Sequence, residues 1–363
     1  AIIFSVAGMI RLNTECFIVD DLPKTGSIYT NLKWFEQQFK GIMPLEIEVD
    51  TKRKNGLLRN TTTMEKINEF SNFIASGNQT AKPMSFVTAL KFAKQAYYDG
   101  DSVDYNLPTE FDMPFLAQYL KKNNEVDGSN KNLLKVMDSY IDSTKETARI
   151  TVNMKDMGSK KLPVLLKQYD SVAHTIFDTS KYKITYTGAT VTFLEGTKYI
   201  VEGLKSSILW ALGIIAICML LLFRSFRILL CSLIPNIIPL MLTAGIMGWT
   251  GIALKPSTVL IFSIALGIAI DVTIRFLVNY KQELPEYGND IDQTLKATIQ
   301  HTGISILYTS MVLIAGFIIF CFSDFSGTKA LGWLTSITLI TATIANLVLL
   351  PILIRDLSSK KKK

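Results

Sequence analysis

Apolar residues dominate the second part of the chain, where five long runs are separated by short polar breaks. Each run is long enough to cross about 30 Å of hydrocarbon as a helix, which takes about 20 residues. The runs cover residues 204–223, 228–249, 257–279, 303–322 and 330–354. We therefore predict a membrane domain of five helices within residues 201–357. Small residues in these runs are expected to allow close helix approach, namely Gly245, Gly248, Gly267 and Gly316.

Shorter periodicities mark the first part of the chain. The opening AIIFSVAGMI is apolar but too short to span a bilayer, so we interpret residues 1–11 as the end of a truncated membrane helix. Residues 12–200 hold most of the charge, and they predict an inserted α/β domain. Strand-like alternation occurs at 45–50, 148–156 and 183–188, and helical spacing at 62–76 and 159–178. The proline-free stretch 190–223 predicts one helix that runs from this domain into the first span.

The distribution of charge orients the predicted helices. The net charge is +7, and four of these charges are the last four residues, so residues 358–363 form a basic tail. Because lysine and arginine favour the cytoplasmic side, we place this tail in the cytoplasm and the α/β domain on the extracytoplasmic side. The same side as the tail carries Arg224, Arg227, Lys281, Lys296 and Arg355, whereas the opposite short loops carry Lys255 and Lys329.

Several classes of function lack support in the sequence. No basic groove with interleaved aromatic residues occurs, so we expect no nucleic-acid partner. Only Cys16 of the four cysteines lies in the polar part, and no Cys-x-x-Cys occurs, so no metal site is expected. We find no Ser-His-Asp set and no phosphate loop, and we expect neither an enzyme nor a cofactor. The paired acids Asp20 and Asp21 are interpreted as solvated surface.

One carboxylate interrupts the third apolar run, in the segment GIAIDVTIRF (267–276). An ionised Asp271 at bilayer depth costs about 2.5–3.5 kcal/mol on insertion scales, and such residues usually mark an ion or proton path. A carboxyl group that is poised to titrate can take up a proton from one side of the membrane and release it to the other. We therefore interpret Asp271 as a proton-relay carboxylate.

Depth in the membrane predicts which polar residues lie near this carboxylate. Asp271 lies about 12 Å from the cytoplasmic end of its run, at 1.5 Å per residue. Thr309, Ser310 and Asn346 lie at the same depth in their own runs, and we predict that they hydrogen-bond or relay toward it. The alternative is that the hydroxyl groups bond their own backbone. Arg275, four residues on, either pairs with Asp271, which would hold the carboxylate charged and argues against free proton cycling, or extends to the cytoplasmic interface. We favour the second.

Seven segments, taken in order along the chain, carry a family resemblance. They are DDLPKTGSIYTNLKWFEQQFKGIMPLEIEVDT (20–51), KPMSFVTALKFAKQAYYDGDSVDYNLP (82–108), ARITVNMKDMGS, TGATVTFLEG, LLFRSFRILLCSLIPNIIPL, GIAIDVTIRFLVNYKQEL and LLPILIRDL. In these segments and in their order, the chain resembles over nearly its whole length the C-terminal half of an RND-superfamily transporter of the MMPL-like, hydrophobe-exporter type.

This resemblance implies a protein of two halves, each with six spans and one porter-type extracytoplasmic domain. It implies proton-driven export of hydrophobic or lipid-like molecules from a bacterial inner membrane, with membrane lipids, the other half, and an oligomer or envelope proteins as partners. The family commonly has a polar or aromatic residue where Val272 stands, a histidine where Arg275 stands and a carboxylate where Asn346 stands. These departures leave open that the other half does more of the proton transfer, and they favour the alternative of a non-transporting structural or sensing component. A further alternative is a translocation helper like SecDF, which resembles the chain in having an aspartate in a similar place.

Overall fold

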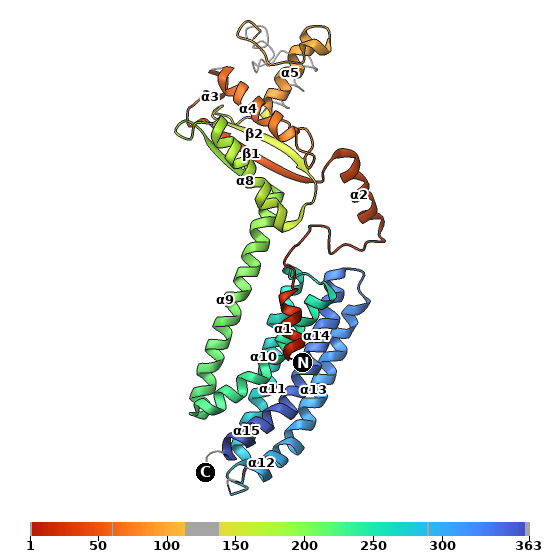
Figure 1. The fold of residues 1–363 in the computed structure, drawn as a ribbon, viewed down its shortest axis with the longest axis vertical. Coiled ribbons are helices and arrows are strands. Elements are labelled where there is room, and N and C mark those ends of the chain that lie inside the picture. The colour runs from red at the N-terminus through yellow and green to blue at the C-terminus, as the bar shows by residue number, and fades with distance from the viewer. Residues whose placement is uncertain (1, 60, 113–137, 289, 360–363) are drawn as a thin grey trace. The chain divides into compact units, whose positions relative to one another are not determined.

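The computed structural model describes residues 2–59, 61–112, 138–288 and 290–359 (Figure 1). The chain divides into two compact units. Residues 1–26 and 196–363 form the first, here named the helical unit, and residues 27–195 form the second, here named the α/β unit. Helix α9 (Ala189–Phe223) is continuous across the boundary in sequence, as the proline-free stretch predicts.

Long apolar helices build the helical unit. They are α1 (Ile2–Ile10), α10 (Phe226–Thr250), α11 (Pro256–Glu283), α13 (Ile304–Ile318) and α14 (Ser326–Ile344), with the shorter α12 (Ile291–Thr298) and α15 (Leu350–Ser359). The π-helical turns η2 (Ile299–Gly303) and η4 (Ala345–Leu349) join α12 to α13 and α14 to α15, and the 3₁₀ turn η3 (Ile319–Phe322) extends α13. Among the described residues, five continuous helices are long and apolar enough to cross a membrane. The prediction of five membrane helices is therefore confirmed.

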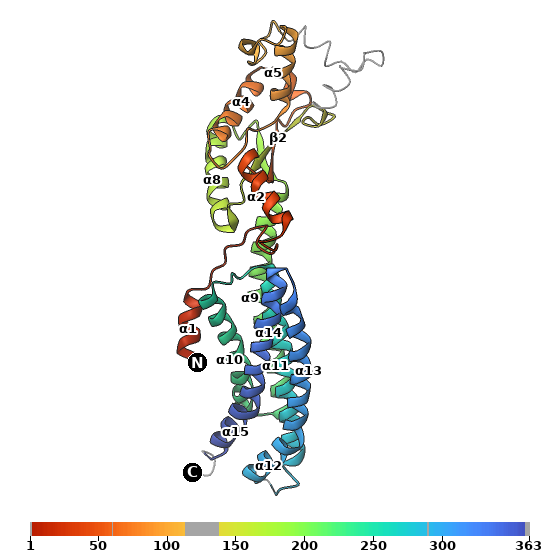
Figure 2. The ribbon, with the colours of Figure 1, turned by 90° about the vertical axis from the view of Figure 1, so that its right-hand side faces the viewer.

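Helices α10, α11 and α14 form the centre of this unit. About half of the most apolar stretch of each is buried, whereas α9 and the helix through α13 leave most of theirs uncovered. Figure 2 shows α11, α13 and α14 side by side, in agreement with their contacts. Buried side chains such as Phe276, Leu277 and Leu334 fill the space between the helices. The polar residues of α10, α11 and α14 therefore lie where they can contact one another.

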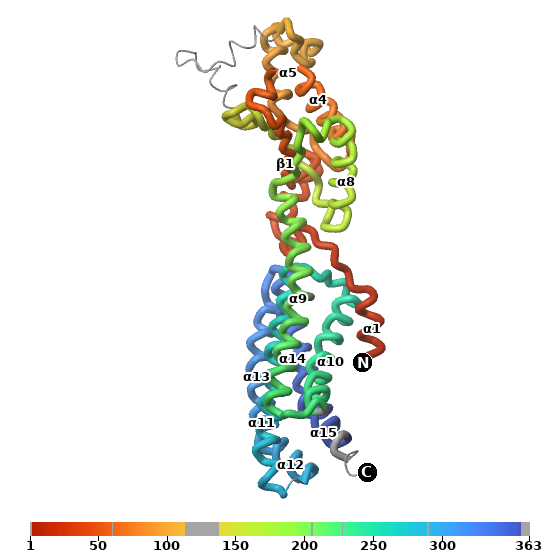
Figure 3. Tube along the Cα trace, turned by 90° about the vertical axis from the view of Figure 1, so that its left-hand side faces the viewer, coloured from red at the N-terminus to blue at the C-terminus, as the bar shows by residue number. Residues whose placement is uncertain are grey.

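Close approach of α1 and α10 depends on small residues (Figure 3). A Cβ atom on Gly248 would lie 1.8 Å from the carbonyl oxygen of Gly8, and one on Gly245 would lie 2.6 Å from the Cα of Ser5. The prediction of close approach is confirmed for these two glycines. It is wrong for Gly267 and Gly316, because no described atom lies within 4 Å of a Cβ built at either position.

A three-stranded antiparallel sheet with the order β2-β1-β3 organises the α/β unit. Strand β1 (Met43–Asp50) lies between β2 (Thr147–Met154) and β3 (Lys183–Thr187). Because both outer strands run antiparallel to β1, they are parallel to each other, and α8 (Gly158–Ile176) connects them as in a split β-α-β unit. The three predicted strands and the strand–helix–strand connection are present, with β1 inserted between the two outer strands.

One face of this sheet is apolar because side chains alternate along each strand. On β1, residues Leu45, Ile47 and Val49 are fully buried. They pack with residues of α8 and of α4 (Thr61–Ala75), including Phe70. The remaining described elements are α2 (Ser27–Phe39), α3 (Gly56–Arg59), α5 (Phe86–Tyr97) and the 3₁₀ turn η1 (Ser102–Asp104).

Candidate functional site

Asp271 lies near the middle of α11 and points away from the buried centre of the helical unit. Its side chain is 54% exposed, and its carboxylate forms an ion pair with the guanidinium of Arg275, one turn further along the helix. A second hydrogen bond joins Arg275 Nε to Asp271 Oδ2 at 3.1 Å. We favoured a position of the Arg275 side chain at the cytoplasmic interface. This prediction is wrong, because Arg275 pairs with Asp271 in the structure. The i, i+4 spacing puts both groups on one helix face.

A separate polar cluster is buried between α10, α11 and the turn η4. Thr273, Asn236 and Asn346 are each at most 1% exposed. The hydroxyl oxygen of Thr273 lies 2.6 Å from Asn346 Oδ1, 2.9 Å from Asn236 Oδ1 and 3.0 Å from the carbonyl oxygen of Ala269. The three side chains therefore join three membrane helices at a single hydroxyl group.

More hydrogen-bond acceptors surround the Thr273 hydroxyl group than its single proton can satisfy. The amide nitrogen of Asn236 donates to the Ser232 carbonyl at 2.8 Å, and that of Asn346 donates to the Ala342 carbonyl at 3.0 Å. Turning either amide over would place its oxygen against a carbonyl oxygen, so both amide oxygens face Thr273. A hydroxyl group has one proton to donate, so the two amide oxygens and the Ala269 carbonyl oxygen compete for it.

The predicted relay neighbours do not gather at Asp271. Asn346 contacts Thr273, Thr309 on α13 donates to the carbonyl of Ser305 at 2.6 Å, and Ser310 is buried. In the described part of the chain, the polar contacts of Asp271 are with Arg275. Depth alone left the direction of each side chain open, because Asp271 and Thr273 point about 160° apart around their helix. The sequence did not lead us to predict a role for Thr273 or Asn236. The feature that could have pointed to Thr273 is its position two residues after Asp271, on the opposite face of the same helix.

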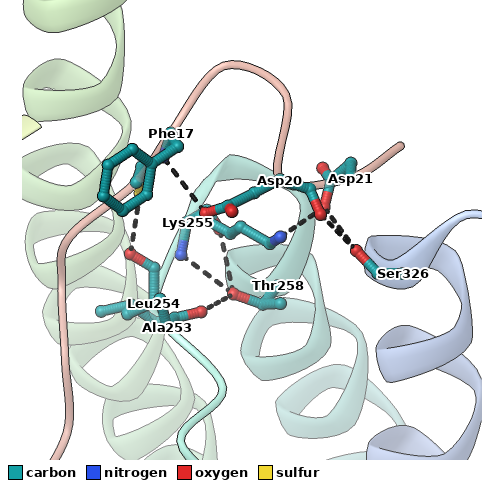
Figure 4. Close-up of polar contacts among 9 residues, drawn as sticks. Phe17, Asp20, Asp21, Ala253, Leu254, Lys255, Thr258 and Ser326 are labelled. Atoms are coloured by element: carbon teal, nitrogen blue, oxygen red, sulfur yellow. Dashed lines mark hydrogen bonds and ion pairs between the residues drawn. The ribbon is translucent and has the colours of Figure 1, made fainter. Parts of the chain in front are cut away.

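A second polar network ties the segment after α1 to the first turns of α11 and α14 (Figure 4). Asp21 forms an ion pair with Lys255, whose side chain is 12% exposed, just before α11. The hydroxyl of Ser326, at the start of α14, donates to the Asp20 carbonyl at 2.7 Å, and the Ser326 amide donates to the Asp21 carbonyl at 3.1 Å. The interpretation of these acids as solvated surface was wrong, because Asp21 is a partner of a largely buried lysine.

We expect Lys255→Met to loosen residues 11–26. Exposed ion pairs contribute about 0–1 kcal/mol, but this lysine is mostly buried and its partner holds the segment that Ser326 also binds. Trypsin should then cleave after the exposed Lys24 several-fold faster, since cleavage follows local opening. Exposed Lys329, in the first turns of α14, provides the control; Lys329→Met should leave the rate unchanged. Equal cleavage of both variants would show that the ion pair does not hold the segment.

The start of α11 explains why Lys255 is fixed in this place. Pro256 occupies the first helical position, and the Thr258 hydroxyl accepts from the Lys255 amide at 3.0 Å and donates to the Ala253 carbonyl at 2.9 Å. These contacts satisfy backbone groups that a helix terminus leaves unpaired. The helix that carries Asp271 is therefore anchored at its first turn to the segment that leads into the α/β unit.

Comparison with known proteins adds two findings to this geometry. The sequence model of the family described as "MMPL family" matches residues 58–363. The "Putative membrane protein MJ1562" of Methanocaldococcus jannaschii is 28% identical to this chain over 144 residues, which cover 39% of this chain and 37% of the relative. This pairwise match therefore spans little more than a third of either protein, whereas the family match includes both α11 and η4.

Proposed function

The chain belongs to the MMPL family, and on that premise we propose that it works in a proton-coupled transporter that exports hydrophobic or lipid-like molecules. In this proposal the protein lies in a cytoplasmic membrane, with the α/β unit as a porter-type domain on the extracytoplasmic side. The observation that carries the proposal is the exposed ion pair of Asp271 and Arg275 in the middle of a membrane helix.

An ion pair in this position is not suited to face lipid. Ionisable side chains in membrane segments almost always face a protein interior or a hydrated path. The same face of α11 exposes Gly267 and Ser263, one and two turns before Asp271, and small residues are typical of helix–helix interfaces in membranes. We infer that a second MMPL-type unit covers this face, either another half of the same protein or a second copy of this chain.

The ion pair also offers a way to couple a proton to movement. A protonated Asp271 has lost the negative charge that attracts Arg275, so the arginine is free to turn away. When the proton leaves, the ion pair re-forms. Proton uptake and closure of the pair therefore exclude each other, which is the property that a proton-driven transporter requires at its coupling site. The substrate class in this proposal comes from the resemblance of the sequence to hydrophobe exporters.

Vesicles that contain the purified protein test this proposal. A pH gradient is imposed, proton flux is followed with an enclosed pH-sensitive dye, and movement of a fluorescent lipid analogue is followed in parallel. We expect both signals to need the gradient and to stop together when a protonophore removes it. Proton-independent movement of the probe would contradict the coupling, and the absence of both signals would favour the second candidate.

That second candidate is a non-transporting structural or sensing component of an envelope assembly. The observation that favours it is the chemistry of the buried cluster, because Asn236, Thr273 and Asn346 hold no group that titrates near neutral pH. In this case the cluster would serve only to hold three helices together.

A further inference from the structure

Helix α2 (Ser27–Phe39) buries a carboxylate while most of its large apolar side chains stay exposed. Its buried residue is Glu36, which is 8% exposed, whereas Trp34 is 59% exposed and Phe39 is 53% exposed. A helix on the surface of a soluble domain normally buries its apolar stripe. Within the described residues, Ile28, Trp34, Phe35 and Phe39 of α2 are therefore left largely uncovered.

Two polar contacts fix the rotation of this helix. Glu36 Oε1 accepts a hydrogen bond of 2.7 Å from the backbone amide of Asp156, in the connection between β2 and α8. Its other oxygen accepts from Lys33 Nζ, also at 2.7 Å. A buried carboxylate that lost these partners would be costly, so α2 cannot roll its apolar side inward without breaking both contacts.

An apolar stripe runs along one side of α2, in which Ile28, Phe35 and Phe39 are exposed and Leu32 is half-buried. Ile28, Leu32, Phe35 and Phe39 follow one another at spacings of four, three and four residues, which places them on one helix face. The rings of Phe35 and Phe39 are stacked with centroids 4.3 Å apart, and the Trp34 ring meets Phe39 edge-on at 6.4 Å. The stripe therefore presents stacked aromatic rings at the end of the helix nearest β1 in sequence.

The covalent chain keeps this stripe near the membrane. Asp21 is bound to Lys255 and Ser326 at the first turns of two membrane helices, and α2 begins six residues later, at Ser27. Six residues span at most about 20 Å when fully extended. Lys24 and Lys40 are exposed on either side of α2, and lysines suit the phosphate groups of lipids. Tryptophan and phenylalanine beside lysine are typical of helices that lie in a membrane interface.

We propose that α2 is an interfacial helix, whose stripe of Ile28, Leu32, Phe35 and Phe39 lies among the headgroups and first acyl carbons of the lipid leaflet next to Lys255 and Ser326. This inference does not depend on transport, since a structural or sensing protein would need the same contact.

Photocrosslinking in the full chain tests this contact. A benzophenone-bearing phenylalanine replaces either Phe35, in the stripe, or Gln37, which is exposed on the opposite side of α2. The two proteins are reconstituted in vesicles of equal parts phosphatidylethanolamine and phosphatidylglycerol and illuminated, and adducts are measured by mass spectrometry. We expect several-fold more phospholipid adduct at position 35 than at position 37, with both lipids captured in proportion to the vesicle composition.

Other outcomes would overturn the proposal. Adducts from position 35 to protein would show that a partner or a second copy covers the stripe. Capture of a single lipid that persists in detergent would show a binding site for cargo. Equal yields at both positions, or no lipid adduct, would show that α2 does not lie in the interface. The same photoreactive residue at position 39 repeats the test if the first variant does not fold.

Discussion

Replacing Asp271 by asparagine is expected to abolish proton-driven transport while the protein still folds. The substitution keeps the shape of the side chain but removes the group that takes up and releases a proton. The carboxylate is 54% exposed and lies outside the buried cluster of Thr273, so the packing of α11 should not change. The gradient-driven movement of the lipid analogue in vesicles should fall to the level of protein-free vesicles.

Two further variants make this result specific. Asp271→Glu keeps a carboxylate and should retain part of the transport. Asp324→Asn removes an exposed carboxylate from the connection between α13 and α14 and should transport like the unchanged protein. Both variants and Asp271→Asn should elute as a single peak in size-exclusion chromatography. Undiminished pH-driven transport by Asp271→Asn would rule out the role of this residue as a proton relay.

The second large effect is expected for Thr273→Val, and it concerns stability. Valine has nearly the shape of threonine but no hydroxyl group, so it removes the one proton that Asn236 and Asn346 share. A buried polar group without its partner costs about 1–3 kcal/mol. We expect a clear fall in the unfolding temperature of the detergent-solubilised protein, because α10, α11 and η4 lose their common contact.

Thr309→Val provides the matched control for this measurement. Its hydroxyl bonds to a carbonyl of its own helix, and the residue is only half-buried on α13. A substitution at such a position should change the free energy of unfolding by no more than about 0.5 kcal/mol. If the two variants unfold at the same temperature, the cluster is not a main support of the helical unit.

Periodicity predicted most of the secondary structure. The five membrane helices follow from runs of apolar residues, since a backbone in lipid must satisfy its hydrogen bonds within each helix. Strands β1, β2 and β3 follow from the alternation of residues such as Leu45, Ile47 and Val49, because neighbouring side chains of a strand point to opposite faces. The insertion of β1 between β2 and β3 did not follow, because pairing connects residues that are far apart in the chain.

The candidate site was likewise predicted from the sequence only in part. The sequence predicted that Asp271 lies near the middle of a membrane helix and that Asn346 lies at the same depth in another. It could not assign the amide to Thr273 instead of Asp271, because the rotation of each helix is decided by what packs against it. Nor could it show that Lys255 binds Asp21, because this contact joins residues more than two hundred positions apart.

The sequence by itself determined which segments are long apolar helices and which form the sheet, and that one carboxylate lies near the middle of the third of these helices. These properties depend on the local order of apolar and polar residues. Only the tertiary structure decided that Asp271 faces outward with Arg275 while Thr273 faces inward to two asparagines. The physical reason is that burial and hydrogen bonding select the rotation of each helix, and both depend on residues contributed by other helices.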